Sequence, residues 1–190
     1  MKKTRIFSTM LATVICMASL PAINAFAANQ QRTTTLDLTT SEFQNDQKNE
    51  DEGWNWDADT LTLTLDNVDF STGNKSSIKV DSLKSTTMLF KGENKLESST
   101  TVIGRTDKAS KDVALTLKGE AKESKLSLVE KGDLPSIDQP NITFESGTVD
   151  IQGGAAITLY TIKVMEAAVN IDTTTVSYTH LRAHETRSNL

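Results

Sequence analysis

Residues 53–70 read GWNWDADTLTLTLDNVDF, and this stretch predicts the fold of the chain. Two tryptophans, Trp54 and Trp56, stand one residue apart, and threonine then alternates with leucine over residues 60–65. Alternation of polar and apolar residues is typical of a β-strand with one buried face, so the three leucines of this run are expected to share that face. The stretch therefore predicts an all-β fold whose first strands carry a pair of aromatic rings.

Similar alternating runs recur along the chain. Each combines a strand, a small residue and a second strand, in residues 87–96, 113–128, 141–151 and 161–171. The small residues follow one another at intervals of roughly 20 to 28 residues and are Gly92, Gly119, Gly147 and Ala167. A shorter element, small and then aliphatic, recurs at residues 77–80, 135–137 and 155–159. This periodicity predicts a β-solenoid, in which each coil completes the core of its neighbour. A β-sandwich, which also has short alternating strands, is the alternative.

The N-terminal residues have the features of a secretory signal peptide. A basic start with Lys2 and Lys3 precedes a mostly apolar run, and Ala-Phe-Ala at residues 25–27 matches a cleavage site. The run is shorter than the roughly 20 residues of a membrane-spanning helix. We therefore predict cleavage after residue 27 and a protein that is secreted or attached to the cell surface. Cys16 is removed with the peptide, so the mature chain has no disulfide.

The C-terminal residues 176–190, VSYTHLRAHETRSNL, differ from everything before them. Both histidines of the protein, His180 and His184, lie in this stretch. VSYTHLRAHET resembles the translation of a transposase-type sequencing adapter, so we expect a non-native tail and a natural chain that continues past residue 175. A native tail with two histidines placed to bind a metal on a helix face is the alternative.

The sequence thus divides into four predicted parts. They are a signal peptide (1–27), a polar N-terminal segment (28–52) with a solvated loop at 45–52, a repeat domain (53–175) and the tail (176–190). Residues 28–175 hold many more carboxylates than basic groups, for a net charge of about −9. This charge argues against nucleic acid or an anionic membrane as a partner.

Three motifs resemble a known family. GWNWDADTLTLTLDNVDF (53–70), SSIKV (76–80) and TTMLFKGENKLES (86–98) resemble right-handed β-helix repeats of secreted and cell-surface proteins of Gram-positive bacteria, described as carbohydrate-binding-domain-containing. The resemblance extends to about residue 171, although the later repeats have fewer glycines than the family. It implies a right-handed parallel β-helix with an N-terminal strand or hairpin cap, truncated at its C-terminal end. It also implies a surface location and polysaccharide binding, which calcium assists in a few relatives.

The chain lacks the residue patterns of common hydrolases. Cleavage of polysaccharides by β-helix enzymes needs two differently tuned carboxylates, often beside a basic partner. Residues 28–175 contain no histidine, no adjacent Asp-Asp pair, no G-x-S-x-G motif and only two arginines, Arg32 and Arg105. We therefore expect a non-catalytic extracellular module for polysaccharide binding or adhesion. A passive spacer of a surface protein is the alternative, and a polysaccharide-degrading enzyme ranks third.

Two sets of residues are candidates for ligand binding. Trp54 and Trp56 point to one side of an extended segment, where they form either a platform for a sugar ring or the cap of the core. Asp66, Asp69 and Asp81 stand near predicted turns and offer hard oxygen ligands for calcium, the one cofactor that the sequence suggests. Their spacing fits neither an EF-hand nor the calcium-binding β-roll repeat, and turn formation with solvated charge is the alternative role.

Overall fold

The computed structural model describes residues 31–106, 110–158 and 161–175, and this part of the chain is all-β. The predicted signal peptide and the predicted tail lie outside the described residues. Strands β1 to β16 are joined by turns and by one short 3-10 helix, η1 (Ser41–Gln44). The described residues form no α-helix, and none of their helices is long and apolar enough to cross a membrane.

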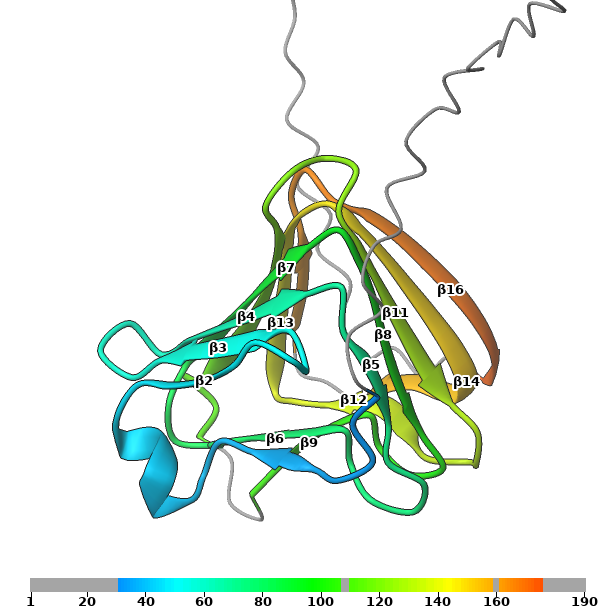
Figure 1. Cartoon of the computed structure of the whole chain (residues 1–190). Coiled ribbons are helices and arrows are strands. Elements are labelled where there is room, and N and C mark those ends of the chain that lie inside the picture. The colour runs from blue at the N-terminus through cyan, green and yellow to red at the C-terminus, as the bar shows by residue number, and fades with distance from the viewer. Residues whose placement is uncertain (1–30, 107–109, 159–160, 176–190) are drawn as a thin grey trace, which may run out of the picture.

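The strands lie in three rows, which Figure 1 shows as the three sides of a triangle. The first row contains β4 (Thr62–Asp66), β7 (Thr86–Lys91), β10 (Ala114–Gly119), β13 (Asn141–Ser146) and β15 (Thr161–Val164). The second contains β5 (Asp69–Ser71), β8 (Glu93–Ser98), β11 (Lys125–Glu130), the first half of β14 (Thr148–Thr158) and β16 (Ala168–Thr175). The third contains β1 (Leu36–Asp37), β6 (Ile78–Val80), β9 (Ile103–Arg105), β12 (Pro135–Asp138) and the second half of β14. From β4 to β14, the chain visits the three rows in turn, and we call each such circuit a pass.

The parallel pairing distinguishes this fold from a β-sandwich. Sandwich sheets of the immunoglobulin type are antiparallel, whereas β7 pairs in parallel with β4 and β10, and β8 with β5 and β11. Parallel neighbours need a long crossover between them, which the chain supplies by running through the other two rows before it returns. The predicted all-β class and the parallel strands are confirmed.

An antiparallel hairpin lies at the N-terminal end of the first row. Its strands are β2 (Gln47–Asn49) and β3 (Trp54–Asp57), and β3 also pairs antiparallel with β4. The prediction of a solvated loop at residues 45–52 was therefore wrong for β2. Its polar residues form a strand because their backbone pairs with β3, while their side chains remain largely accessible.

The inward side chains explain the alternation in the sequence. They lie in register from one pass to the next, so that Phe70, Leu96, Leu128 and Ile151 form one continuous column in the second row. All four are fully buried. Burying an apolar side chain of this size contributes about 1.5–3 kcal/mol. The outward neighbours on the same strands are polar, with the exception of Val129.

The corner between the first and second rows requires a left-handed backbone conformation. Asn67, Gly92 and Gly147 have φ values of 54°, 60° and 79° and connect successive pairs of strands there. Glycine adopts this conformation without penalty, and asparagine does so more readily than most residues. Gly119 ends β10 differently, because residues 120–124 form a loop before β11 begins.

Leu61 was predicted on the buried face with Leu63 and Leu65, and this part of the prediction was wrong. Its φ of 53° places it in the turn that precedes β4, which begins at Thr62. Leu63 and Leu65 are fully buried, whereas Leu61 is only partly buried against the edge of the core. The alternation of threonine and leucine includes Leu61, but strand β4 does not.

A buried amide connects three successive passes near this corner. Asn94 is 2% exposed, and its Oδ1 accepts a hydrogen bond of 3.1 Å from the Val68 backbone N–H. Its Nδ2 donates to the carbonyl oxygens of Lys91, at 2.7 Å, and Lys125, at 3.3 Å. The hydrogen-bonding capacity of this polar side chain is therefore used inside the stack, as burial requires.

Candidate functional site

A groove of about 450 Å³ crosses the outer surface of the second row. We call it the β8–β11 groove. Its lining residues come from β5, β8, β11 and β14 and from the corner beside them, and are Asn67, Val68, Asp69, Glu93, Asn94, Lys95, Lys125, Ser127, Val129 and Gln152. Because side chains at i and i+2 share one face of a strand, the polar half of each alternating run is brought to this surface.

Ion pairs form on this surface both between neighbouring strands and along one strand. Lys125 Nζ lies 2.7 Å from Asp150 Oδ2, and Lys95 Nζ lies 2.8 Å from Glu97 Oε2. Lys131 Nζ contacts the other oxygen of Glu97 at 2.5 Å. Both acids are largely covered, with side-chain exposures of 13% for Glu97 and 18% for Asp150, but their lysines are 43–55% exposed, so solvent still screens each pair in part.

The lysines shift the protonation equilibria of these acids. Hydrogen bonds from Lys131 and Lys95, helped by Ser71, lower the pKa of Glu97 to about 2. The hydrogen bond from Lys125 likewise lowers the pKa of Asp150, with a further contribution from Asn170. Both groups therefore remain ionised in moderately acidic solution.

Acid is expected to destabilise the protein partly through Glu97. Because its folded pKa lies below the ordinary value of 4.5, Glu97 contributes stability that is present above pH 4.5 and lost as the pH falls through about 2. Solvent screening limits the loss to the order of 1–3 kcal/mol. Urea unfolding at intervals across this window should show a shallower pH dependence for Glu97→Gln than for the parent chain. The exposed Glu123→Gln is the control, and an equal change in both variants would contradict this assignment.

Two carboxylates of the groove keep acceptor capacity that the described residues do not use. Asp69 Oδ2 accepts a hydrogen bond from Gln31 Nε2 at 3.2 Å, but Asp69 Oδ1 is buried without a partner. Among the residues that the structure describes, it is the only buried side-chain polar atom in this condition. The Glu93 carboxylate also accepts no hydrogen bond from any described residue, although its backbone N–H donates to Asn67 Oδ1 at 3.0 Å. Glu93 therefore offers an acceptor to an incoming donor, and Asp69 offers a second one once its buried oxygen turns toward the groove.

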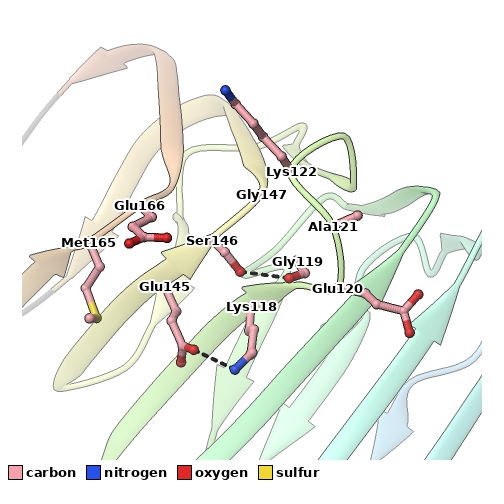
Figure 2. A pocket seen from close by; sticks show the side chains of 10 residues that line it. All are labelled: Lys118, Gly119, Glu120, Ala121, Lys122, Glu145, Ser146, Gly147, Met165 and Glu166. Carbon is pink, nitrogen blue, oxygen red and sulfur yellow. Dashed lines mark hydrogen bonds and ion pairs between the residues drawn. The ribbon is translucent and has the colours of Figure 1, made fainter.

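A second groove, of about 590 Å³, lies where the loop after β10 projects beside the β13–β14 turn. Figure 2 shows Lys118 and Glu145 directed toward one another across this corner groove, and their charged atoms are 2.6 Å apart. Ser146 Oγ donates to the Gly119 carbonyl at 2.7 Å, while Lys122 extends away from the ion pair. Among the described residues that line this groove, no buried polar side-chain atom lacks a partner, so the β8–β11 groove is the stronger candidate.

The two tryptophans lie in the N-terminal hairpin, away from the β8–β11 groove. Trp56 is 3% exposed, its Nε1 donates to the Phe43 carbonyl at 2.9 Å, and its ring meets that of Phe43 edge-on at 6.3 Å. Trp54 is partly buried, and its Nε1 donates to Glu52 Oε2 at 2.7 Å. The Arg32 guanidinium lies 5.9 Å from the centre of the Trp54 ring. Of the two roles considered for these tryptophans, a sugar platform and a cap of the core, this packing is what a cap requires.

The three candidate calcium ligands are not assembled into one site. Asp69 lies in the β8–β11 groove, whereas Asp66 is exposed at the end of β4 and accepts a hydrogen bond from Asn67 Nδ2 at 2.8 Å. Asp81 lies at a different corner, where its Oδ1 accepts from the Leu83 backbone N–H at 2.8 Å. In residues 31–106, 110–158 and 161–175, no three His, Cys, Asp or Glu side chains are grouped to hold a metal ion.

Sequence reasoning identified one residue of this groove, Asp69, and missed the rest. Lys95, Lys125 and Ser127, which line the groove, occupy outward positions of equivalent strands, and that equivalence was the available signal. A constant spacing in the sequence does not locate the equivalent positions, because the loop after β10 changes the number of residues in one pass.

Comparisons with known proteins identify no relative. No protein-family model, no curated protein and no solved structure matches this chain.

Proposed function

We propose that this chain is an exported, non-catalytic carbohydrate-binding module built on a right-handed parallel β-helix. The three parallel rows and the passes that connect them support the helix. Connections between parallel strands of one sheet are right-handed in nearly all proteins, which supports a right-handed β-helix. The predicted signal peptide supports export to the cell surface or the medium, and the resemblance of residues 53–98 to secreted β-helix repeats points the same way.

The observation that carries the binding proposal is the composition of the β8–β11 groove. It is an open surface on a rigid sheet, lined by carboxylates, amines, amides and a hydroxyl. A sugar presents many hydroxyl groups that donate and accept hydrogen bonds, and such groups need fixed polar partners. Side chains on strands provide these more accurately than side chains on loops do. Ser127 and Gln152 are well suited, because their side chains form no hydrogen bond with the described residues.

A passive structural spacer is the second candidate, and one observation favours it. Both lysines of the groove are engaged by carboxylates of the same surface, Lys125 with Asp150 and Lys95 with Glu97. Such pairs also occur on surfaces that only need to remain soluble and avoid edge-to-edge aggregation. A spacer would retain this charge pattern without binding any glycan.

Retention on immobilised polysaccharides separates the two candidates. We expect the mature chain, residues 28–190, to be retained on at least one polysaccharide of a panel of neutral and acidic plant and microbial polymers. The double substitution Ser127→Ala with Gln152→Ala removes two hydrogen-bonding groups, each contributing about 0.5–1.5 kcal/mol, so affinity should fall roughly tenfold. Thr116→Ala with Thr143→Ala, on the first row, is the matched control and should leave retention unchanged. Absence of retention on every polymer, with folded protein, would support the spacer.

A further inference from the structure

We propose that the β8–β11 groove selects neutral, hydroxyl-rich sugars over polymers of uronic acids. This inference rests on the proposed carbohydrate binding and specifies its ligand class. It follows from the balance of hydrogen-bond donors and acceptors in the groove, and from the charges that surround it.

The groove has an excess of acceptors. Asp69 Oδ1 is buried without a partner, and the Glu93 carboxylate receives no hydrogen bond from the described residues. Leaving a buried carboxylate oxygen unpaired is costly, and a hydrogen bond to an ionised acceptor is stronger than one between neutral groups. A sugar hydroxyl supplies the donor that these oxygens lack, whereas a carboxylate on the ligand would add further acceptors.

The cationic donors of the groove are already engaged. Lys125 lies 2.7 Å from Asp150, and Lys95 lies 2.8 Å from Glu97. Glu97 also accepts from Ser71 Oγ at 3.0 Å, which holds the second pair in place. A uronate would have to displace one of these carboxylates from its lysine, and the displaced acid would lose a cationic partner in a largely covered position. Glu97 would keep Lys131 and Ser71, and Asp150 would keep Asn170. Because the acids are covered and the lysines are about half exposed, this exchange costs more than breaking a fully exposed pair and less than breaking a buried one.

The surrounding field also disfavours an anionic ligand. Besides Asp69 and Glu93, the carboxylates of Glu97 and Asp150 border the groove, and Lys95, Lys125 and Lys131 are the amines that face them. The acids therefore outnumber the bases here, in a chain whose net charge is −5. A neutral ligand enters without repulsion, while a polyanion approaches against it.

Asp69 can present its unpaired oxygen to the groove by a small movement. The torsion about the Cβ–Cγ bond of aspartate has a broad energy profile, so the turn itself costs little beyond the hydrogen bond from Gln31 that it gives up. Asp69 pairs in register with Lys95 on the neighbouring strand, and both residues line the groove. A ligand hydroxyl at this point meets an acceptor from β5 beside the side chains of β8.

The test measures binding of residues 28–190 to two sets of soluble polysaccharides by affinity electrophoresis. The neutral set contains β-glucan, mannan, galactan and arabinan, and the acidic set contains polygalacturonate and alginate. Each is run once with EDTA and once with calcium chloride. We expect retardation by at least one neutral polymer, unaffected by EDTA, and at least about tenfold weaker retardation by either polyuronate.

Substitutions assign the selectivity to the groove. Glu93→Gln and Asp69→Asn should each weaken neutral binding about tenfold, while Glu93→Lys should shift the preference toward the polyuronates. Glu145→Gln in the corner groove is the matched control and should change neither, and circular dichroism confirms that each variant is folded. Preferred binding of a polyuronate by the parent chain, with or without calcium, would overturn the inference and leave the proposed function intact. Binding to neither set would remove the proposed function, and the inference with it.

Discussion

Replacing Trp56 with alanine is expected to lower the free energy of unfolding by about 3–5 kcal/mol, the usual cost of truncating a buried aromatic side chain. Trp56 is 3% exposed, packs edge-on against Phe43 and donates its indole N–H to the Phe43 carbonyl. The alanine variant loses the buried ring area and leaves that carbonyl without its partner. For a domain of this size the melting temperature should fall by roughly 6–20 °C, which differential scanning calorimetry measures directly.

Asn55→Ala is the matched control for Trp56→Ala. Asn55 is the intervening residue of the same strand, and its side chain is exposed. Its replacement should change the stability by no more than about 0.5 kcal/mol. A Trp56→Ala protein that keeps its melting temperature but no longer binds polysaccharide would show that the ring contacts ligand and does not support the fold.

Gly147→Ala is expected to destabilise the protein for two separable reasons. The φ of 79° places a residue with a side chain in the left-handed region, at a cost of about 1–2 kcal/mol. A Cβ at this position would also lie 2.8 Å from Phe90 Cε2 and 2.9 Å from the Ser124 carbonyl oxygen. Overpacking of this kind adds about 1–3 kcal/mol, and equilibrium urea unfolding measures the total.

Gly73→Ala separates the backbone contribution from the packing contribution. Gly73 has a φ of 62°, but a Cβ built there meets nothing within 4 Å. It should therefore show only the backbone cost of about 1–2 kcal/mol. If both glycine variants lost the same stability, the close approach of Phe90 to Gly147 would have no energetic consequence, contrary to the packing described here.

The parts of the fold that the sequence predicts are those set by local alternation. In residues 87–96 and 141–151, inward and outward side chains alternate along each strand. The structure has two strands in each of these ranges, with a left-handed glycine between them. Leu61 continues the same period but lies in a turn, because a two-residue repeat does not mark where a strand begins. The short strand β2 was missed for the opposite reason, since its partner β3, and not its own composition, makes it a strand.

The candidate site was less predictable because it depends on registration between distant residues. Lys125 and Asp150 become neighbours only because β11 and β14 pair in parallel with Ser127 opposite Asp150. Nothing near either residue in the sequence indicates that pairing. The unpaired oxygen of Asp69 is likewise a property of the packed surface. The sequence identified Asp69 as a candidate ligand, but it could not show that one of its carboxylate oxygens lacks a hydrogen-bond partner.

The buried amide of Asn94 affects how the stack comes apart. In an array whose passes contact only their neighbours, the ends can fray one pass at a time, because each loss exposes a single interface. Asn94 hydrogen-bonds to the pass before it, through Val68, and to the pass after it, through Lys125. Detaching either neighbour breaks one of these hydrogen bonds in addition to exposing the apolar side chains of the interface, which adds to the cost of detaching that pass. We therefore expect the three passes around Asn94 to separate less readily than passes joined by apolar contacts alone.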